Sequence, residues 1–156
     1  MMVRSLLIVT AVGAGLIGGV MFAFSTFIMP ALSRLEPRQG IAAMQAINRA
    51  APNAFFMTAL FGTAVTSIAL AVATVVRHDA SASYAVMACV LYFTGIVLTV
   101  VYHVPRNNAL DVVDPGGNDA ADVWGNYVRG WTAWNHVRTV SALSASAVLV
   151  WAATGT

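Results

Sequence analysis

Charged residues are scarce in this sequence, and their scarcity argues against a soluble protein. Aspartate, glutamate, lysine and arginine make up 9% of the 156 residues, whereas soluble domains carry about 25%. Lysine is absent, so all eight basic residues are arginines. They form no basic run that would bind a phosphate backbone, which argues against a nucleic-acid partner. Because 59% of the residues are hydrophobic, the composition indicates an integral membrane protein.

Cysteine and metal-binding motifs are also scarce. The single cysteine, Cys89, excludes an intramolecular disulfide and leaves the redox compartment open. His103 and His136 lack the spacings typical of metal ligands, so we predict no metal site. A glycine-rich nucleotide fingerprint and a nucleophile elbow are missing. By elimination we expect a site without a bound cofactor, and the alternative is a haem held between His103 and His136.

Long uncharged segments predict four membrane-spanning helices, because about 20 apolar residues suffice to cross a bilayer as a helix. The predicted spans are residues 5–29, 54–76, 84–102 and 134–153. The fourth qualifies only if His136 and Arg138 are tolerated at its edge. We therefore expect one integral membrane domain over residues 1–156, an all-α transmembrane four-helix bundle.

The connections between the predicted spans differ in length. Pro30 is expected to end the first span, and Pro37 to begin a short amphipathic helix in RQGIAAMQAINRAA that lies at the membrane interface. DPGGND predicts a turn, followed by a helical extension before span four with Asp119 as its N-cap. Both long connections lie on the same side of the membrane, because an even number of crossings separates them.

The arginines suggest how the protein is oriented. The long connections contain Arg34, Arg38, Arg49, Arg106 and Arg129. The positive-inside rule therefore predicts that these connections are cytoplasmic, and we expect the plasma membrane as the location. In the first span, Gly15 and Gly19 are four residues apart. This spacing indicates close helix packing inside the bundle or, alternatively, a homodimer interface.

A charged residue inside the fourth span is the strongest functional signal. One face of this helix contains Trp131, Asn135, Arg138, Thr139, Ala142 and Ser146, with His136 at its flank. A cation near the membrane boundary that faces the bundle interior is a candidate functional residue. The alternative is that Arg138 extends to the lipid headgroups, but a headgroup contact does not need Asn135 and Thr139 on the same face.

Polar residues from other segments are expected at the same end of the bundle. Pro105 is predicted to stop the third span in YHVPRNNAL, with His103 just inside it and Asn107 and Asn108 just after it. The amphipathic helix contributes Gln45 and Asn48, one turn apart. Near the end of the first span, the Ser25 and Thr26 hydroxyls reach the same region or bond back to their own helix. The neighbouring aromatic residues are Trp124, Tyr127, Trp131 and Trp134, which form an interfacial belt or wall a flat pocket.

These motifs carry a resemblance to a known family. FSTFIMPAL with the following MQAIN, then VPRNNAL, then WGNYVRGWTAWNHVRT resemble the anthrone oxygenase-like family of small four-span membrane proteins. The resemblance implies oxidation of an anthrone to an anthraquinone by dioxygen, with no obvious cofactor. By motif match it carries over Pro105, Asn107, Trp131, Asn135 and Arg138 as family residues.

The resemblance and the residues together suggest a membrane oxidoreductase, a cofactor-independent oxygenase or oxidase of a lipophilic anthrone- or hydroquinone-like compound. His136 or His103 would be the general base. Arg138, Asn135 and Asn107 would hold the oxyanion. The predicted substrate contacts are Trp131, Trp134, Tyr127, Trp124, Gln45, Asn48 and Asn108. The alternative is a non-catalytic membrane module that binds a lipophilic ligand or supports a larger complex.

Overall fold

Four long helices build the molecule, and every secondary-structure element in the described residues, 2–155, is helical in this computed structural model. The elements are α1 (Met2–Ala23), η1 (Phe24–Ile28), α2 (Met29–Leu32), α3 (Pro37–Ala50), α4 (Ala54–Val76), α5 (Ala82–Leu98), η2 (Thr99–His103), α6 (Val104–Asp111) and α7 (Ala120–Thr154). The segments named η are π-helical and continue the flanking α-helices without a break.

The arrangement is the predicted four-helix bundle. Helix α7 packs along α1 and α5, and α4 packs against α1 and α5. Four helices, at residues 2–32, 54–76, 82–111 and 120–154, are long and apolar enough to cross a membrane. The fold class predicted from the sequence is therefore confirmed, and the helices agree with an integral membrane protein. Which side of the membrane each end faces stays a prediction.

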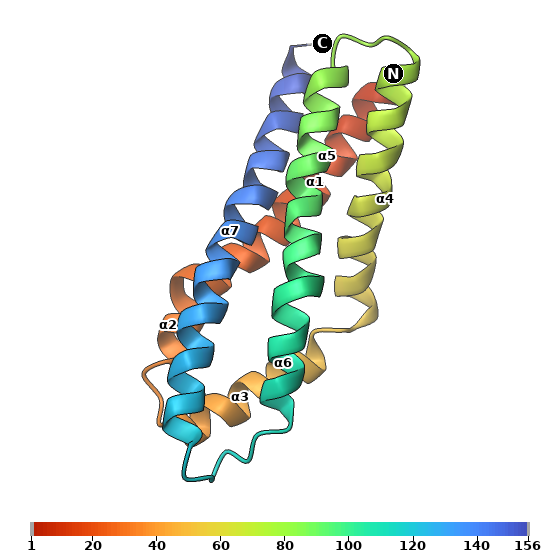
Figure 1. The fold of residues 1–156 in the computed structure, drawn as a ribbon. Coiled ribbons are helices and arrows are strands. Elements are labelled where there is room, and N and C mark those ends of the chain that lie inside the picture. The colour runs from red at the N-terminus through yellow and green to blue at the C-terminus, as the bar shows by residue number, and fades with distance from the viewer. Residues whose placement is uncertain (1, 156) are drawn as a thin grey trace.

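The two ends of the bundle differ in structure. Figure 1 shows both termini at one end, whereas α3 and the loop between α6 and α7 close the other end. Helix α3 packs on α6 and α7 and buries Gly40, Ile41, Met44 and Gln45. The predicted amphipathic helix is thus present, and its apolar face covers the end of the bundle. Its position at a membrane interface stays a prediction.

Helix α7 also contains the predicted extension before the fourth span. It runs unbroken for 35 residues, which corresponds to about 52 Å at 1.5 Å per residue. The hydrocarbon core of a bilayer is only about 30 Å thick, so part of α7 must project beyond it. Asp119 occupies the N-cap position as predicted, but its side chain makes no capping hydrogen bond.

Two prolines that were expected to end spans lie inside continuous helices, so this expectation was wrong. Pro30 and Pro105 each follow a π-helical segment by two residues. In these segments the N–H of Met29 bonds to the Phe24 carbonyl, and the N–H of Val104 bonds to that of Thr99. This wider hydrogen-bond register precedes each proline, whose ring cannot fit an unmodified α-helix. The chain therefore stays helical to Leu32 and Asp111.

The buried side chains form two apolar clusters with a polar layer between them. We call the cluster that includes Met21 on α1 and Ala145 on α7 the upper cluster. We call the cluster that includes Met29 on α2 and Trp131 on α7 the lower cluster. The buried polar residues between these levels are Ser25, Asn135, Arg138 and Thr139. Burying such a polar layer in an apolar bundle costs free energy unless its groups form hydrogen bonds. The layer is therefore the candidate position for a functional site.

The glycines of α1 serve packing against neighbouring helices. A Cβ atom on Gly15 would lie 3.1 Å from the Ser146 hydroxyl of α7. One on Gly18 would lie 2.7 Å from the Leu143 side chain, also on α7. Gly15 therefore faces α7, which supports the interpretation of close packing inside the bundle. Gly19 is exposed and has no heavy atom within 4 Å of its Cβ position. A homodimer interface stays an untested prediction.

Gly40 gives a direct test of how α3 closes the bundle. A Cβ atom there would lie 2.5 Å from the Trp124 ring, so Gly40→Ala should destabilise the protein by about 1–3 kcal/mol through overpacking. Thermal unfolding in detergent should show a lower midpoint. Gly62→Ala is the matched control, because its Cβ position has no atom within 4 Å. Equal midpoints for the two variants would contradict the packing of α3 described above.

Candidate active site

A cavity of about 450 Å³ lies at the level of the polar layer. This volume falls in the range of small-molecule sites. Its walls come from α1, η1, α3, α4, η2, α6 and α7. The walls are mostly apolar, with Phe24, Phe56, Met57, Leu60 and Trp131 among the lining side chains. Among the described residues no aspartate or glutamate lines this space.

Arg138 lines the cavity with a guanidinium that has no carboxylate partner. Its side chain is buried, with 7% of the residue exposed, as its position on the inward face of the helix predicted. Within residues 2–155, the one ion pair joins Arg49 to Asp111 at 3.6 Å on the exposed surface. The hydrogen bond found for Arg138 is from Nη1 to the Asn135 amide oxygen, at 3.4 Å. A buried cation without a counterion is costly, so the site is suited to an anionic oxygen of a ligand.

Asn135 positions this cation and does not reach the cavity. Its amide nitrogen donates to the Met21 carbonyl at 2.8 Å and to the Ser25 hydroxyl at 2.9 Å. The side chain is completely buried and is not a lining residue. The structure does not favour the prediction that Asn135 holds a substrate oxyanion, because its amide hydrogens are donated to Met21 and Ser25. Its oxygen remains available to hold Arg138.

The two neighbouring hydroxyls on η1 behave differently. Ser25 bonds across the bundle, accepting from Asn135 and sharing a hydrogen bond with the Thr139 hydroxyl at 2.9 Å. Thr26 donates back to the Phe22 carbonyl of its own helix at 2.7 Å. Both alternatives considered for this pair therefore occur, one for each residue.

His103 lines the cavity and is almost fully buried. Its Nδ1 lies 3.2 Å from the Leu98 carbonyl and its Nε2 lies 3.3 Å from the Trp131 carbonyl. A neutral imidazole donates from one nitrogen only, whereas the protonated ring donates from both. A neutral ring therefore donates to one of the two carbonyls, and the lone pair of its other nitrogen faces the second.

His136 does not join this site. Its side chain is exposed and does not line the cavity, because it lies about 100° around α7 from Asn135. The expectation that His136 is the base is therefore not met by its position. His136 lies outside the cavity that His103 lines, so the two histidines share no cavity that could hold a haem between them, and the cofactor content stays a prediction.

Asn107 is held in a fixed orientation at the cavity wall. Its amide oxygen accepts from the Tyr127 hydroxyl at 2.8 Å and from the Trp131 ring nitrogen at 3.0 Å. With the oxygen occupied by two donors, the amide nitrogen is the group that this side chain offers to a ligand. Asn107 thus remains a candidate for holding a substrate oxygen.

Only one of the two predicted polar residues on α3 reaches the cavity. Asn48 lines it, and its amide nitrogen is buried without a hydrogen-bond acceptor. Gln45 instead donates to the carbonyls of Leu110 and Val113, both at 2.9 Å, and ties α3 to the end of α6. The structure does not favour the prediction that Gln45 contacts substrate, because Gln45 does not line the cavity and its amide hydrogens satisfy carbonyls at a helix end. Asn108 is exposed and does not line the cavity either.

The four aromatic residues predicted to contact substrate lie in different surroundings. Trp131 lines the cavity, whereas Trp124 and Tyr127 stack on each other at 5.8 Å inside the lower apolar cluster. Trp134 is 42% exposed and packs against Tyr102, outside the cavity. Trp124, Tyr127 and Trp134 are therefore not substrate contacts in this structure. Tyr127 acts indirectly, through its hydrogen bond to Asn107.

Several residues that line the cavity were not predicted from the sequence. Thr99 lines the cavity from η2, and Phe56, Met57 and Leu60 line it from the start of α4. The apolar residues carry no signal that separates a cavity wall from a lipid-facing surface. Thr99 had one usable signal, since it lies one turn before His103 on the same helix face.

The Asn135 network predicts a specific loss of stability. Asn135→Ala would remove the donor to the Met21 carbonyl and to Ser25, and buried groups left unsatisfied cost about 1–3 kcal/mol. Thermal unfolding in detergent should show the loss. Thr26→Ala should stay within about 0.5 kcal/mol of the wild type, because its bond is local and exposed. Equal effects in the two variants would refute a cross-bundle role for this network.

One of three comparisons with known proteins identified a family. The family model described as anthrone oxygenase matches residues 44–148. This region includes Asn48, His103, Asn107, Trp131 and Arg138, which all line the cavity. Searches of curated proteins and of solved structures found no match. Because the matched region covers more than half of the 156 residues, this chain belongs to the anthrone oxygenase family.

Proposed function

We propose that the protein is a membrane oxygenase that oxidises a lipophilic aromatic compound with dioxygen as co-substrate. The observation that carries the proposal is the buried Arg138 guanidinium, which has no carboxylate partner and faces an apolar cavity without acidic residues. The family description, anthrone oxygenase, supports the same class of reaction. The compound would be an anthrone- or hydroquinone-like molecule.

The residues that line the cavity match both the aromatic rings and the oxygen atom of such a molecule. Flat aromatic rings fit the apolar walls, which include Phe24, Phe56 and Trp131. The oxygen of the substrate meets hydrogen-bond donors, supplied by Arg138 and Asn107. Each well-aimed donor stabilises a developing oxyanion by about 3–4 kcal/mol. The cavity therefore favours the deprotonated, enolate or phenolate form of the compound over the neutral form.

The reaction balances without an external reductant. A base removes one proton from the reactive methylene, and the resulting enolate reduces dioxygen. One oxygen atom becomes the new carbonyl oxygen on that carbon, and the other leaves as water after the second methylene proton is lost. A methylene group that becomes a carbonyl gives up four electrons, which is the number needed to reduce both oxygen atoms. The protein has to bind, orient and deprotonate the substrate.

His103 is the base that the geometry favours. It lines the cavity, and its hydrogen bonds to the Leu98 and Trp131 carbonyls, at 3.2 and 3.3 Å, are long. Catalytic hydrogen bonds often rearrange when the substrate binds, so Nε2 can turn from the Trp131 carbonyl to the substrate. After it takes the proton, the ring can donate to these carbonyls from both nitrogens.

Arg138→Gln tests the role of the cation. Purified protein should consume oxygen with one or more of a panel of anthrones, hydroquinones and flavonoid-like phenols, and Arg138→Gln should lower kcat/KM by about 100- to 1,000-fold. Arg129→Gln is the matched control, because Arg129 lies on the same helix, is exposed and bonds to Asn126. Equal activity of the two variants would refute the site. Tight binding of a phenolate by wild-type protein without oxygen consumption would favour a non-catalytic binding module.

The two histidines give a second comparison. His103→Gln should lower kcat by about 100- to 10,000-fold, the range for loss of a general base. His136→Gln should leave kcat unchanged, since the exposed His136 ring does not line the cavity. Oxygen-consumption rates at saturating substrate provide the measurement. The reverse order of effects would assign the base to His136 and contradict the geometry.

A further inference from the structure

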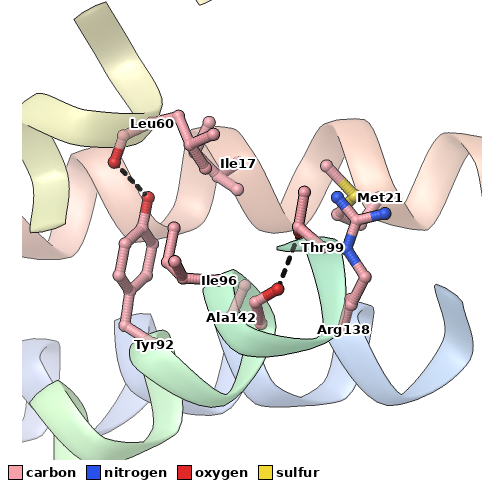
Figure 2. Close-up of a pocket in the computed structure, with 9 residues that line it drawn as sticks. Ile17, Met21, Leu60, Tyr92, Ile96, Thr99, Arg138 and Ala142 are labelled. Atoms are coloured by element: carbon pink, nitrogen blue, oxygen red, sulfur yellow. Dashed lines mark hydrogen bonds between the residues drawn. The ribbon is translucent and has the colours of Figure 1, made fainter. Parts of the chain in front are cut away.

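A second, much smaller space adjoins the main cavity. Its volume is about 10 Å³, which is roughly enough for one molecule of the size of water. We call it the small recess. Figure 2 shows it between α1, α4, α5 and α7, with the Arg138 guanidinium beside Met21 and Thr99. Met21, Leu60, Thr99 and Arg138 line both spaces, so the guanidinium lies at the boundary between them.

The walls of the small recess are apolar apart from this cation and two hydroxyls. Ile17, Ile96 and Ala142 contribute aliphatic groups. The Tyr92 hydroxyl donates to the Leu60 carbonyl at 2.9 Å, and the Thr99 hydroxyl donates to the Gly95 carbonyl at 2.8 Å (Figure 2). Both hydroxyl protons are therefore used by the backbone. The guanidinium is the donor that remains for an occupant.

These walls suit a small apolar molecule better than water. A buried water usually makes about three hydrogen bonds to otherwise unsatisfied polar groups. The small recess instead offers aliphatic surface together with a single uncompensated charge from Arg138. An occupant that enters neutral and apolar, and becomes an anion during the reaction, matches both features.

We infer that the small recess is the dioxygen site of the enzyme, an inference that rests on the proposed oxygenase function. Neutral dioxygen is apolar and only slightly larger than water, so it matches the size and the aliphatic walls of the small recess. When it accepts an electron it becomes superoxide, and a negative charge appears beside Arg138. The cation thus stabilises the reduced state and not the neutral one, which is the condition for lowering the barrier of this step.

The position of Arg138 allows it to serve both substrates. A guanidinium has five N–H donors, and the hydrogen bond found here uses one of them, at Asn135. The remaining donors can hold the enolate oxygen in the main cavity and the reduced dioxygen in the small recess. The enolate passes one electron to dioxygen, which leaves a carbon radical and superoxide.

The following steps complete the exchange of atoms. The radical and superoxide join to form a carbon–oxygen bond, and the peroxide anion takes a proton from the His103 imidazolium. The second methylene proton then leaves, the oxygen–oxygen bond breaks, and water departs as the carbonyl forms. The positions of the two spaces on either side of one guanidinium keep the reacting carbon and dioxygen adjacent.

Ala142 allows the small recess to be filled from one wall. It lines the small recess and not the main cavity, and 4% of the residue is exposed. Ala142→Val adds two methyl groups at this wall, in the space that dioxygen would occupy. Ile96 also lines only the small recess and is half-buried, so Ile96→Phe is a second filling variant. Thermal unfolding in detergent checks that both variants fold.

The kinetic experiment measures the KM for dioxygen and the KM for the aromatic substrate separately, in Ala142→Val and in Ile96→Phe. We expect the KM for dioxygen to rise at least tenfold in both variants, with the KM for the aromatic substrate changed less than twofold. Ala133→Val is the matched control, since Ala133 lies on the same helix as Ala142, is exposed and lines neither space. An unchanged KM for dioxygen in both test variants would overturn the inference and leave the oxygenase function standing.

A second measurement needs no turnover. Dissolved dioxygen is paramagnetic and speeds the relaxation of nearby methyl groups in NMR spectra. Ile17 lines the small recess and is 4% exposed, whereas Leu7 on the same helix is 0% exposed and lines no cavity found here. We expect several-fold faster relaxation at Ile17 than at Leu7, reduced in Ala142→Val. Equal slow relaxation would overturn the inference. Fast relaxation at Ile17 without any substrate oxidation would refute the proposed function, and the enzymatic role of the small recess with it.

Discussion

The structure depends on how an apolar bundle accommodates one uncompensated cation. Arg138 lies among helices that provide it with no carboxylate, and an amide oxygen of Asn135 is the partner found for it. Asn135 is in turn held by the backbone of Met21 and by Ser25. A chain of hydrogen bonds therefore runs from the first helix to the charge. On the proposed function, an anionic substrate in the cavity would offset the remaining electrostatic cost.

Two deformed helix segments bring the other functional groups to this level. The π-helical segment η1 carries Ser25 and Phe24, and η2 carries Thr99 and His103. Each segment precedes a proline, and each contributes side chains to the polar layer or to the cavity. π-helical segments inside α-helices occur frequently at functional sites. Here they change the direction of side chains on two different helices without interrupting either helix.

The fold was predictable from the sequence because it follows from bulk properties. Hydropathy identified four spans, and helical periodicity placed Arg138 and Asn135 on the inward face of α7. The site was only partly predictable, because neighbours in a motif point in different directions around a helix. His136 and Trp134 follow or precede Asn135 directly, yet both are exposed. Periodicity, and not adjacency in the motif, separates these residues correctly.

Other errors came from backbone groups, which a sequence does not display. Gln45 satisfies carbonyls at the end of α6, and the prolines at 30 and 105 are tolerated by a shifted hydrogen-bond register. The residue types alone predict neither the contacts of Gln45 nor the shifted register before the prolines. Both depend on which backbone carbonyls lack a hydrogen-bond donor in the neighbouring turn. The lining residues of α4 were missed for a related reason, because a phenylalanine beside a cavity resembles one beside lipid.

The length of α7 bears on how a substrate would enter the cavity and how water would leave it. The helix is about 20 Å longer than a bilayer core is thick, and Trp131 and Arg138, which line the cavity, lie beside the start of the fourth span predicted at residues 134–153. On the proposed function, the active centre would therefore lie at the border between lipid and water. A lipophilic substrate would enter sideways from the lipid, while the water that the reaction generates would have a short path to the aqueous phase.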